Sequence, residues 1–164
     1  MKKRRTSKGK GRRTAVWLGL AVLLAAAGFV LMRPATDSVY RQMYPRKYSH
    51  YIEQYSREYG VDKNLVYAVT RIESNFDPQA VSSADARGLM QMTSDAFDWV
   101  QYRMGDEKLA ICAYHAGMSN VRSWLSQENY SKDGKTLDKI PYSDTEWYYD
   151  KVSQAKQIYK ELYS

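Results

Sequence analysis

The chain has 164 residues, which is enough for one modest domain with attachments and excludes two separately folded cores. Hydrophobic residues make up 44% and charged residues 26%, a composition typical of a globular protein and not of a disordered one. The net charge of +7 arises at the N-terminus, because eight of the 25 basic residues precede Thr14 and leave 17 against 18 acidic residues. The rest is close to neutral, which argues against a nucleic-acid partner.

The N-terminal 32 residues have the pattern of a membrane anchor. Residues 1–14 form a basic tail without acids, and residues 15–32, AVWLGLAVLLAAAGFVLM, carry no charge over 18 positions. Such a run is just long enough to cross a bilayer as a helix, and the positive-inside rule keeps the basic tail cytoplasmic. A cleaved signal peptide is the alternative, but more apolar residues follow Ala25–Ala27, so we favour an uncleaved signal anchor. We expect a single-pass cell-membrane protein whose following part lies outside the cytoplasm.

The next segments predict a linker and two helices. Residues 33–47 contain Pro34 and Pro45 and are assigned to a linker. Residues 48–59 place tyrosines at helical spacing, and Gly60 can end that helix. Asp62 can cap a second helix over residues 63–74, whose apolar stripe consists of Leu65, Val66, Val69 and Ile72.

The remaining segments predict loops and further helices, with almost no strand signal. Residues 75–83 read as an irregular loop with a short extended piece near Ala80 and Val81, and residues 85–100 as mostly helical. A helix over 107–116 can stop at Gly117, and another can start at Ser119 or Asn120. After the polar loop 126–139, a last helix begins near Thr145. The pattern indicates a mainly α domain over residues 48–164.

Cysteine and histidine usage exclude a disulfide framework and a metal site. The single cysteine, Cys112, lies among apolar residues, so we expect a buried, inert thiol. His50 and His115 are the two histidines, and no metal-ligand spacing or glycine-rich phosphate loop is present. No cofactor is expected.

Glu73 is the acidic residue whose position invites a catalytic interpretation. It lies four residues after Val69 and seven after Val66, so its carboxyl faces the side that the helix buries. Desolvation and the negative end of the helix dipole would both raise its pKa, as a general acid requires. Position alone favours a glutamate that is solvated or ion-paired with Arg71, Arg87 or another base, because most glutamates at helix ends are.

Three motifs follow one another along the exported part. The first runs from Glu73-Ser74 to Gly88-Leu89-Met90-Gln91, the second is AYHAG at residues 113–117, and the third is IPYSDTEWYYDKV at residues 140–152. Together they resemble the catalytic signature of lytic transglycosylases of the soluble, goose-type-lysozyme-like superfamily. The second motif is similar to that family's AYNAG and the third to its P-x-x-T-x-x-Y-V-x-x-V.

The resemblance implies a lysozyme-like fold, mainly α within the α+β class. It also implies that the domain acts on the glycan strands of peptidoglycan. The expected reaction cleaves the β-1,4 bond between N-acetylmuramic acid and N-acetylglucosamine and leaves 1,6-anhydro ends. Glu73 would be the sole catalytic acid and base, with the substrate's own N-acetyl group assisting. Tyr114 would hydrogen-bond near the carboxyl, and Tyr148 would come in from the last helix. The residues expected to bind substrate are Ser82, Gln91, Tyr114, His115 and Tyr148.

Three departures from the family pattern leave alternatives open. His115 stands where the family usually has asparagine, and Asp85 where it often has glycine. The segment between Gln91 and Tyr114 is markedly shorter than in typical members and lacks a helix that they carry there. A hydrolytic muramidase that uses water, and a non-catalytic peptidoglycan-binding module, therefore stand beside the transglycosylase as hypotheses.

Overall fold

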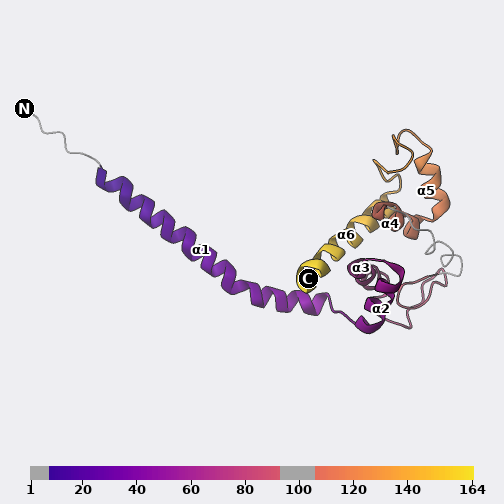
Figure 1. Cartoon of the computed structure of the whole chain (residues 1–164), viewed down its shortest axis with the longest axis horizontal. Helices are drawn as coiled ribbons and strands as arrows, with labels where there is room; N and C mark the ends of the chain where they lie inside the picture. The colour runs from indigo at the N-terminus through magenta and orange to yellow at the C-terminus, as the bar shows by residue number, and fades with distance from the viewer. Residues whose placement is uncertain (1–7, 93–105) are drawn as a thin grey trace, which may run out of the picture. The chain divides into compact units, whose positions relative to one another are not determined.

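The computed structural model describes residues 8–92 and 106–164, which divide into two compact units, Met1–Met43 and Tyr44–Ser164 (Figure 1). The first unit contains helix α1, Lys8–Met43, with Pro34 inside it. Residues 33–43, which the sequence pattern assigns to a linker, are therefore helical. In residues 8–92 and 106–164, no helix has a stretch both long and apolar enough to span a membrane.

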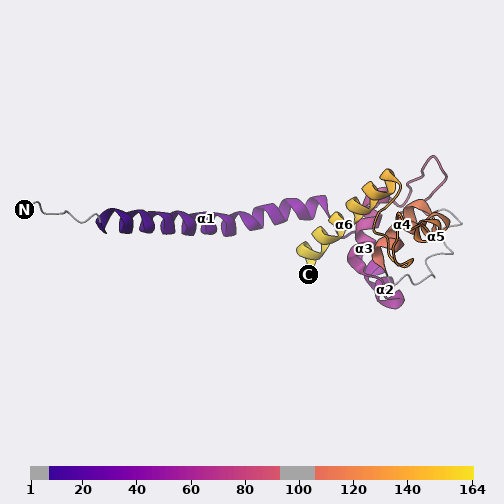
Figure 2. The ribbon, with the colours of Figure 1, turned by 90° about the horizontal axis from the view of Figure 1, so that it is seen from above.

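The second unit is built from helices in its described part (Figure 1). They are α2 (Ser49–Tyr59), α3 (Lys63–Ser74), α4 (Glu107–Ala116), α5 (Met118–Leu125) and α6 (Ser143–Tyr163). Helix α6 packs along α3 and against α4, α2 packs against α3, and α5 against α4; Figure 2 shows the same group turned by a quarter. The long C-terminal helix thus brings together α3 and α4, which are far apart in sequence.

Local capping explains where these helices begin and end, as the sequence predicts. The Asp62 carboxylate accepts a hydrogen bond from the Asn64 N–H at 2.8 Å and starts α3. Gly60 follows α2 with a φ of 68°, a left-handed conformation that glycine adopts without strain. Gly117 ends α4, also with a positive φ. Helix α5 begins at Met118, one residue before the earliest predicted start.

The prediction of a mostly helical segment over residues 85–100 is wrong for its described part. Residues 84–92 form turns, with isolated antiparallel bridges joining Arg87 to Val81 and to Met92. Asp85, Gly88 and Gln91 all have positive φ, which a right-handed helix cannot accommodate. The apolar spacing that suggested a helix here is therefore overridden by turn geometry. Residues 93–100 lie outside the described residues.

Two clusters of buried side chains form the core of the second unit. One lies between α2, α3 and α6 and includes Tyr67, Val152 and Tyr159. The other lies around α4 and α5 and includes Cys112 and Trp124. Cys112 is fully buried, as predicted, and burial raises the pKa of its thiol to about 11. At neutral pH this thiol is protonated and unreactive.

Lys156 on α6 fixes where α3 and α4 begin. Its Nζ lies 3.1 Å from an Asp62 oxygen and 2.5 Å from Glu107 Oε2. Because Asp62 caps α3 and Glu107 is the first residue of α4, one ammonium group holds both helix starts against α6. The two helices that carry Glu73 and Tyr114 are therefore set on a common support.

Candidate active site

The candidate site centres on Glu73, in the last turn of α3. Its side chain is half-buried, and the hydroxyl of Tyr148 on α6 donates a hydrogen bond to its Oε1 at 2.5 Å. The helical period had placed this carboxyl on the buried side of α3, and that prediction is confirmed. Of the two arginines considered as ion-pair partners, Arg87 pairs with Asp85 at 2.8 Å, and the Arg71 guanidinium lies over the Tyr44 ring.

The environment of Glu73 favours its protonated form. Burial raises the pKa of the carboxyl, while the Tyr148 hydrogen bond and the positive field of His115 oppose the rise. The net shift is upward from the ordinary value of 4.5. No second carboxylate is among the described groups that shift this pKa. A carboxyl that keeps its proton to higher pH can act as a general acid.

Tyr148 presents its hydroxyl to Glu73 from a buried, stacked position. Its ring lies parallel to that of Tyr114, with centroids 6.2 Å apart, and 4.5 Å from the imidazole of His115. Burial raises the pKa of the Tyr148 phenol, and the Glu73 carboxylate raises it further. Tyr148 is therefore a neutral donor at any physiological pH. The three aromatic residues form one group beside the carboxyl.

Tyr114 holds the turn at residues 88–91, which is the last part of the first motif. Its hydroxyl donates to the main-chain oxygen of Met90, and burial together with the nearby Glu73 charge raises the pKa of its phenol. We predicted that Tyr114 would hydrogen-bond near the catalytic carboxyl. The structure puts Tyr114 close enough to sense that charge and gives the direct bond to Tyr148.

Ser74 has a role that the sequence did not reveal. Its Oγ lies 2.7 Å from the Leu89 carbonyl oxygen and 3.1 Å from that of Thr70. The end of α3 is thereby attached to the turn at residues 88–91, which the Tyr114 hydroxyl also contacts. The acceptors are main-chain oxygens, so no residue pattern identifies them. Because Ser74 lies next to Glu73 in the first motif, its position is the sequence signal that could have indicated a role at the site.

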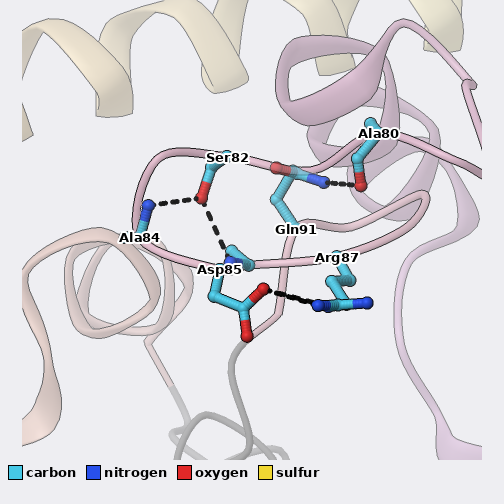
Figure 3. A network of polar contacts seen from close by, with 7 residues as sticks. Ala80, Ser82, Ala84, Asp85, Arg87 and Gln91 are labelled. Atoms are coloured by element: carbon cyan, nitrogen blue, oxygen red, sulfur yellow. Dashed lines mark hydrogen bonds and ion pairs between the residues drawn. The ribbon is translucent and has the colours of Figure 1, made fainter.

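Ser82 and Gln91 form hydrogen bonds to the main chain of the loop that follows α3 (Figure 3). The Gln91 side-chain amide donates to the carbonyl oxygens of Ala80 and Gly88, both at 2.9 Å. The Ser82 hydroxyl accepts from the N–H groups of Ala84 at 3.2 Å and Ala86 at 3.1 Å. Gly88 permits this turn through its φ of 75°. Direct contact of Ser82 and Gln91 with substrate stays a prediction.

His115 is an exposed residue in the last turn of α4. Its Nδ1 lies 3.1 Å from Oγ1 of Thr145, a buried residue on α6. Thr145 belongs to the third motif, but the sequence analysis assigns it no function. It lies three residues before Tyr148 and so shares a helix face with it, which is the pattern that could have indicated a joint role. Thr145 and Tyr148 together position the imidazole.

Replacing Tyr148 with Phe should raise the pKa of Glu73. The lost hydrogen bond favours the carboxylate, so without it the proton is held more tightly. Titration of the carboxyl followed by ¹³C NMR measures this midpoint. Tyr142→Phe is the matched control, because the Tyr142 hydroxyl bonds to Asn120. A midpoint that stays in place or falls in Tyr148→Phe would contradict the assigned contact.

Comparison with known proteins places these residues in a known context. Residues 50–108 match the family model described as Transglycosylase SLT domain. Proteins called membrane-bound lytic murein transglycosylase C, from Klebsiella pneumoniae and Cronobacter sakazakii, are each 54% identical over 46 residues. That stretch is 28% of this chain and 13% of either relative. The chain thus aligns with only a small part of the relatives' length.

A solved structure shares the fold. An inactive mutant of the lytic transglycosylase Slt from Pseudomonas aeruginosa aligns with a TM-score of 0.58 at 22% sequence identity, covering 73% of this chain and 25% of that one. The predicted fold class is confirmed in its mainly helical, lysozyme-like character. Residues 50–108, which contain Glu73 and the Gly88–Gln91 turn, are therefore similar to a transglycosylase SLT domain, set in the fold of a lytic transglycosylase.

Proposed function

We propose that the chain is a peptidoglycan lytic transglycosylase that cleaves the β-1,4 bond between N-acetylmuramic acid and N-acetylglucosamine. The observation that carries the proposal is the half-buried Glu73 carboxyl with its raised pKa and its Tyr148 donor. The match of residues 50–108 to the SLT domain and the names of the relatives support it.

Glu73 can serve in turn as acid and base in this reaction. Protonated Glu73 gives its proton to the glycosidic oxygen as the bond to the anomeric carbon breaks, and N-acetylglucosamine leaves with its new hydroxyl. The Glu73 carboxylate then takes the proton of the muramoyl C6 hydroxyl, whose oxygen bonds to the anomeric carbon. This closes the 1,6-anhydro ring and restores protonated Glu73. The Tyr148 hydrogen bond stabilises the carboxylate between the two steps.

The nearby loop acids are engaged in local structure, which supports a mechanism with one protein carboxylate. Asp85 is exposed and pairs with Arg87, and Asp77 accepts a hydrogen bond from the Gln79 N–H at 2.9 Å. Both are turn residues and not presented nucleophiles. We therefore assign to the substrate's N-acetyl oxygen the part that a second carboxylate plays in retaining glycosidases.

We assign substrate contacts to Ser82, Gln91, Tyr114, His115 and Tyr148. The stacking of the last three rings beside Glu73 supports their place in the sugar site. For Ser82 and Gln91 the support is their position in the loop that meets the Gly88 turn. The shortened segment between Gln91 and Tyr114 falls largely on residues 93–105, outside the described residues.

Digestion of purified peptidoglycan by the solubilised full-length chain tests the proposal. Mass spectrometry of the released fragments should find 1,6-anhydro-muramoyl ends, and a Glu73→Gln preparation serves as the blank. Reducing ends would instead identify a hydrolytic muramidase. Intact glycan that co-sediments with the protein would identify a binding module. Either of the last two results overturns the transglycosylase assignment.

We further propose that residues 15–32 attach the chain to the cell membrane, with residues 1–14 in the cytoplasm and residues 48–164 facing the cell wall. Support comes from the uncharged 18-residue run behind eight basic residues and from the exposed apolar side chains of Trp17, Leu23 and Leu24. The relatives are themselves named as membrane-bound.

Membrane fractionation should recover the full-length chain in the pellet after alkaline carbonate extraction. Removal of residues 1–32 should move the protein to the supernatant, since the uncharged run is then lost. External protease should digest residues 48–164 in spheroplasts and leave a tag placed before Lys2 intact. Extraction of the full-length chain by carbonate would contradict the anchor.

A further inference from the structure

His115 is a neighbour of the catalytic carboxyl and can be neutral or positively charged. We propose that it is a positioning residue whose protonation state sets how readily Glu73 holds its proton. The inference rests on the proposed function for its catalytic meaning. The family that this chain resembles usually has an asparagine at the position of His115. An imidazole can gain a positive charge, whereas the asparagine amide cannot.

The geometry connects the imidazole to Glu73 through one residue. The His115 ring stacks on the Tyr148 ring with centroids 4.5 Å apart and an interplanar angle of 29°. Tyr148 in turn donates its hydroxyl to Glu73 Oε1 at 2.5 Å. Thr145 fixes the other side of the ring through its contact with Nδ1 at 3.1 Å. Both Thr145 and Tyr148 are buried on α6, so the imidazole is held on a rigid support.

The Thr145 contact can persist in both protonation states. A hydroxyl is both donor and acceptor, so it can donate to a neutral imidazole nitrogen or accept from a protonated one. The ring therefore changes charge without having to move. His115 therefore acts on Glu73 through its charge, and not through a contact that breaks when the ring is protonated.

The charged and titratable groups around His115 determine in which direction it shifts the pKa of Glu73. They include Glu73 from α3, Tyr148 from α6 and Tyr114 from α4. Asp144 on α6 belongs with them, because its carboxylate accepts a hydrogen bond from the N–H of Thr145, whose hydroxyl contacts His115. Both tyrosines stay neutral, because burial and the Glu73 charge raise their pKa. Charge coupling is thus between the imidazolium and the carboxylate. The cation favours ionised Glu73, and the neutral ring lets Glu73 keep its proton.

This coupling suits a residue that works first as an acid and then as a base. A neutral His115 favours protonated Glu73, which is the form that starts the reaction. A charged His115 also polarises the Tyr148 ring from one face, as cations do over aromatic rings, and strengthens the donor that stabilises the carboxylate.

The proposal is tested on the full-length chain, labelled at the glutamate carboxyl carbon and solubilised in detergent. The Glu73 signal is assigned by its loss in Glu73→Gln, and its titration is followed by ¹³C NMR. In His115→Asn we expect the Glu73 midpoint to rise, because the cation that favours the carboxylate is gone. His115→Gln is a second amide variant with the same expected result. His50→Asn is the control, since His50 lies on α2 against Tyr51.

A midpoint in His115→Asn and His115→Gln that equals the wild-type value, or lies below it, would overturn the proposal. The pH profile of peptidoglycan cleavage gives the second readout. Its descending limb should move to higher pH in both variants, whereas a merely structural role would lower the rate equally at every pH. A shifted NMR midpoint in a protein that does not cleave glycan would count against the proposed function and leave the coupling standing. Cleavage with an unmoved midpoint would count against the coupling alone.

Discussion

Replacing Glu73 with Gln should lower the rate of peptidoglycan cleavage by about 10²- to 10⁴-fold, the usual contribution of one general acid and base. The amide has nearly the same shape, and its oxygen can still accept the hydrogen bond from Tyr148. It can neither give a proton to the glycosidic oxygen nor take one from the C6 hydroxyl. Release of soluble muropeptides from purified glycan, followed over time, measures the loss.

Thermal unfolding of the same variant shows whether its fold is retained. The pKa of Glu73 is raised in the folded protein, so the folded state binds more protons than the unfolded state above the ordinary pKa of a glutamate. Stability therefore falls as pH rises from that ordinary value through the raised one. Gln has no such penalty, and Glu73→Gln should melt at a slightly higher temperature at neutral pH. Unchanged cleavage, or a loss of cleavage together with a lower Tm, would contradict the assignment.

Tyr159→Ala should lower the free energy of unfolding by about 3–5 kcal/mol, the cost typical of truncating a large buried aromatic side chain. Tyr159 has no exposed surface, and its ring stacks on that of Tyr67 with centroids 5.2 Å apart. Its hydroxyl donates to the Pro45 carbonyl oxygen at 3.1 Å. Removal leaves a cavity between α3 and α6, the pair of helices that brings Tyr148 to Glu73. Urea unfolding monitored by circular dichroism measures the effect.

Two variants separate the parts of this effect. Tyr159→Phe keeps the ring and loses only the bond to Pro45, which is expected to cost about 0.5–1.5 kcal/mol. Tyr55→Ala removes a tyrosine that is 48% exposed on α2, and its stability should change by no more than about 0.5 kcal/mol. If Tyr159→Ala were as mild as Tyr55→Ala, the α3–α6 core would not be what holds the site together.

The helices could be predicted because their signals are local. Asp62 caps α3, Gly60 and Gly117 stop α2 and α4, and the apolar period of α3 turns Glu73 inward. The segment 85–92 was misread because its turns depend on positive φ values, which composition does not reveal at Asp85 or Gln91. At such positions the backbone conformation is set by tertiary contacts such as those from Ser74 and Tyr114.

The site could be predicted in its members but not in its contacts. Glu73 and Tyr148 are 75 residues apart, so their hydrogen bond follows from the packing of α6 on α3 and from no local pattern. The turn carbonyls held by Ser74 and Tyr114 belong to the main chain and leave no trace in residue identity. The placement of His115 over Tyr148 likewise depends on how α4 lies against α6.

Glycan digestion in oxygen-18-labelled water tests most directly whether the Glu73 site catalyses an intramolecular transfer. If the C6 hydroxyl attacks the anomeric carbon, the muramoyl ends contain no oxygen from water, and mass spectrometry should find unlabelled 1,6-anhydro ends that disappear with Glu73→Gln. Labelled reducing ends formed by the wild-type chain would show that water is the nucleophile and would contradict the transglycosylase mechanism.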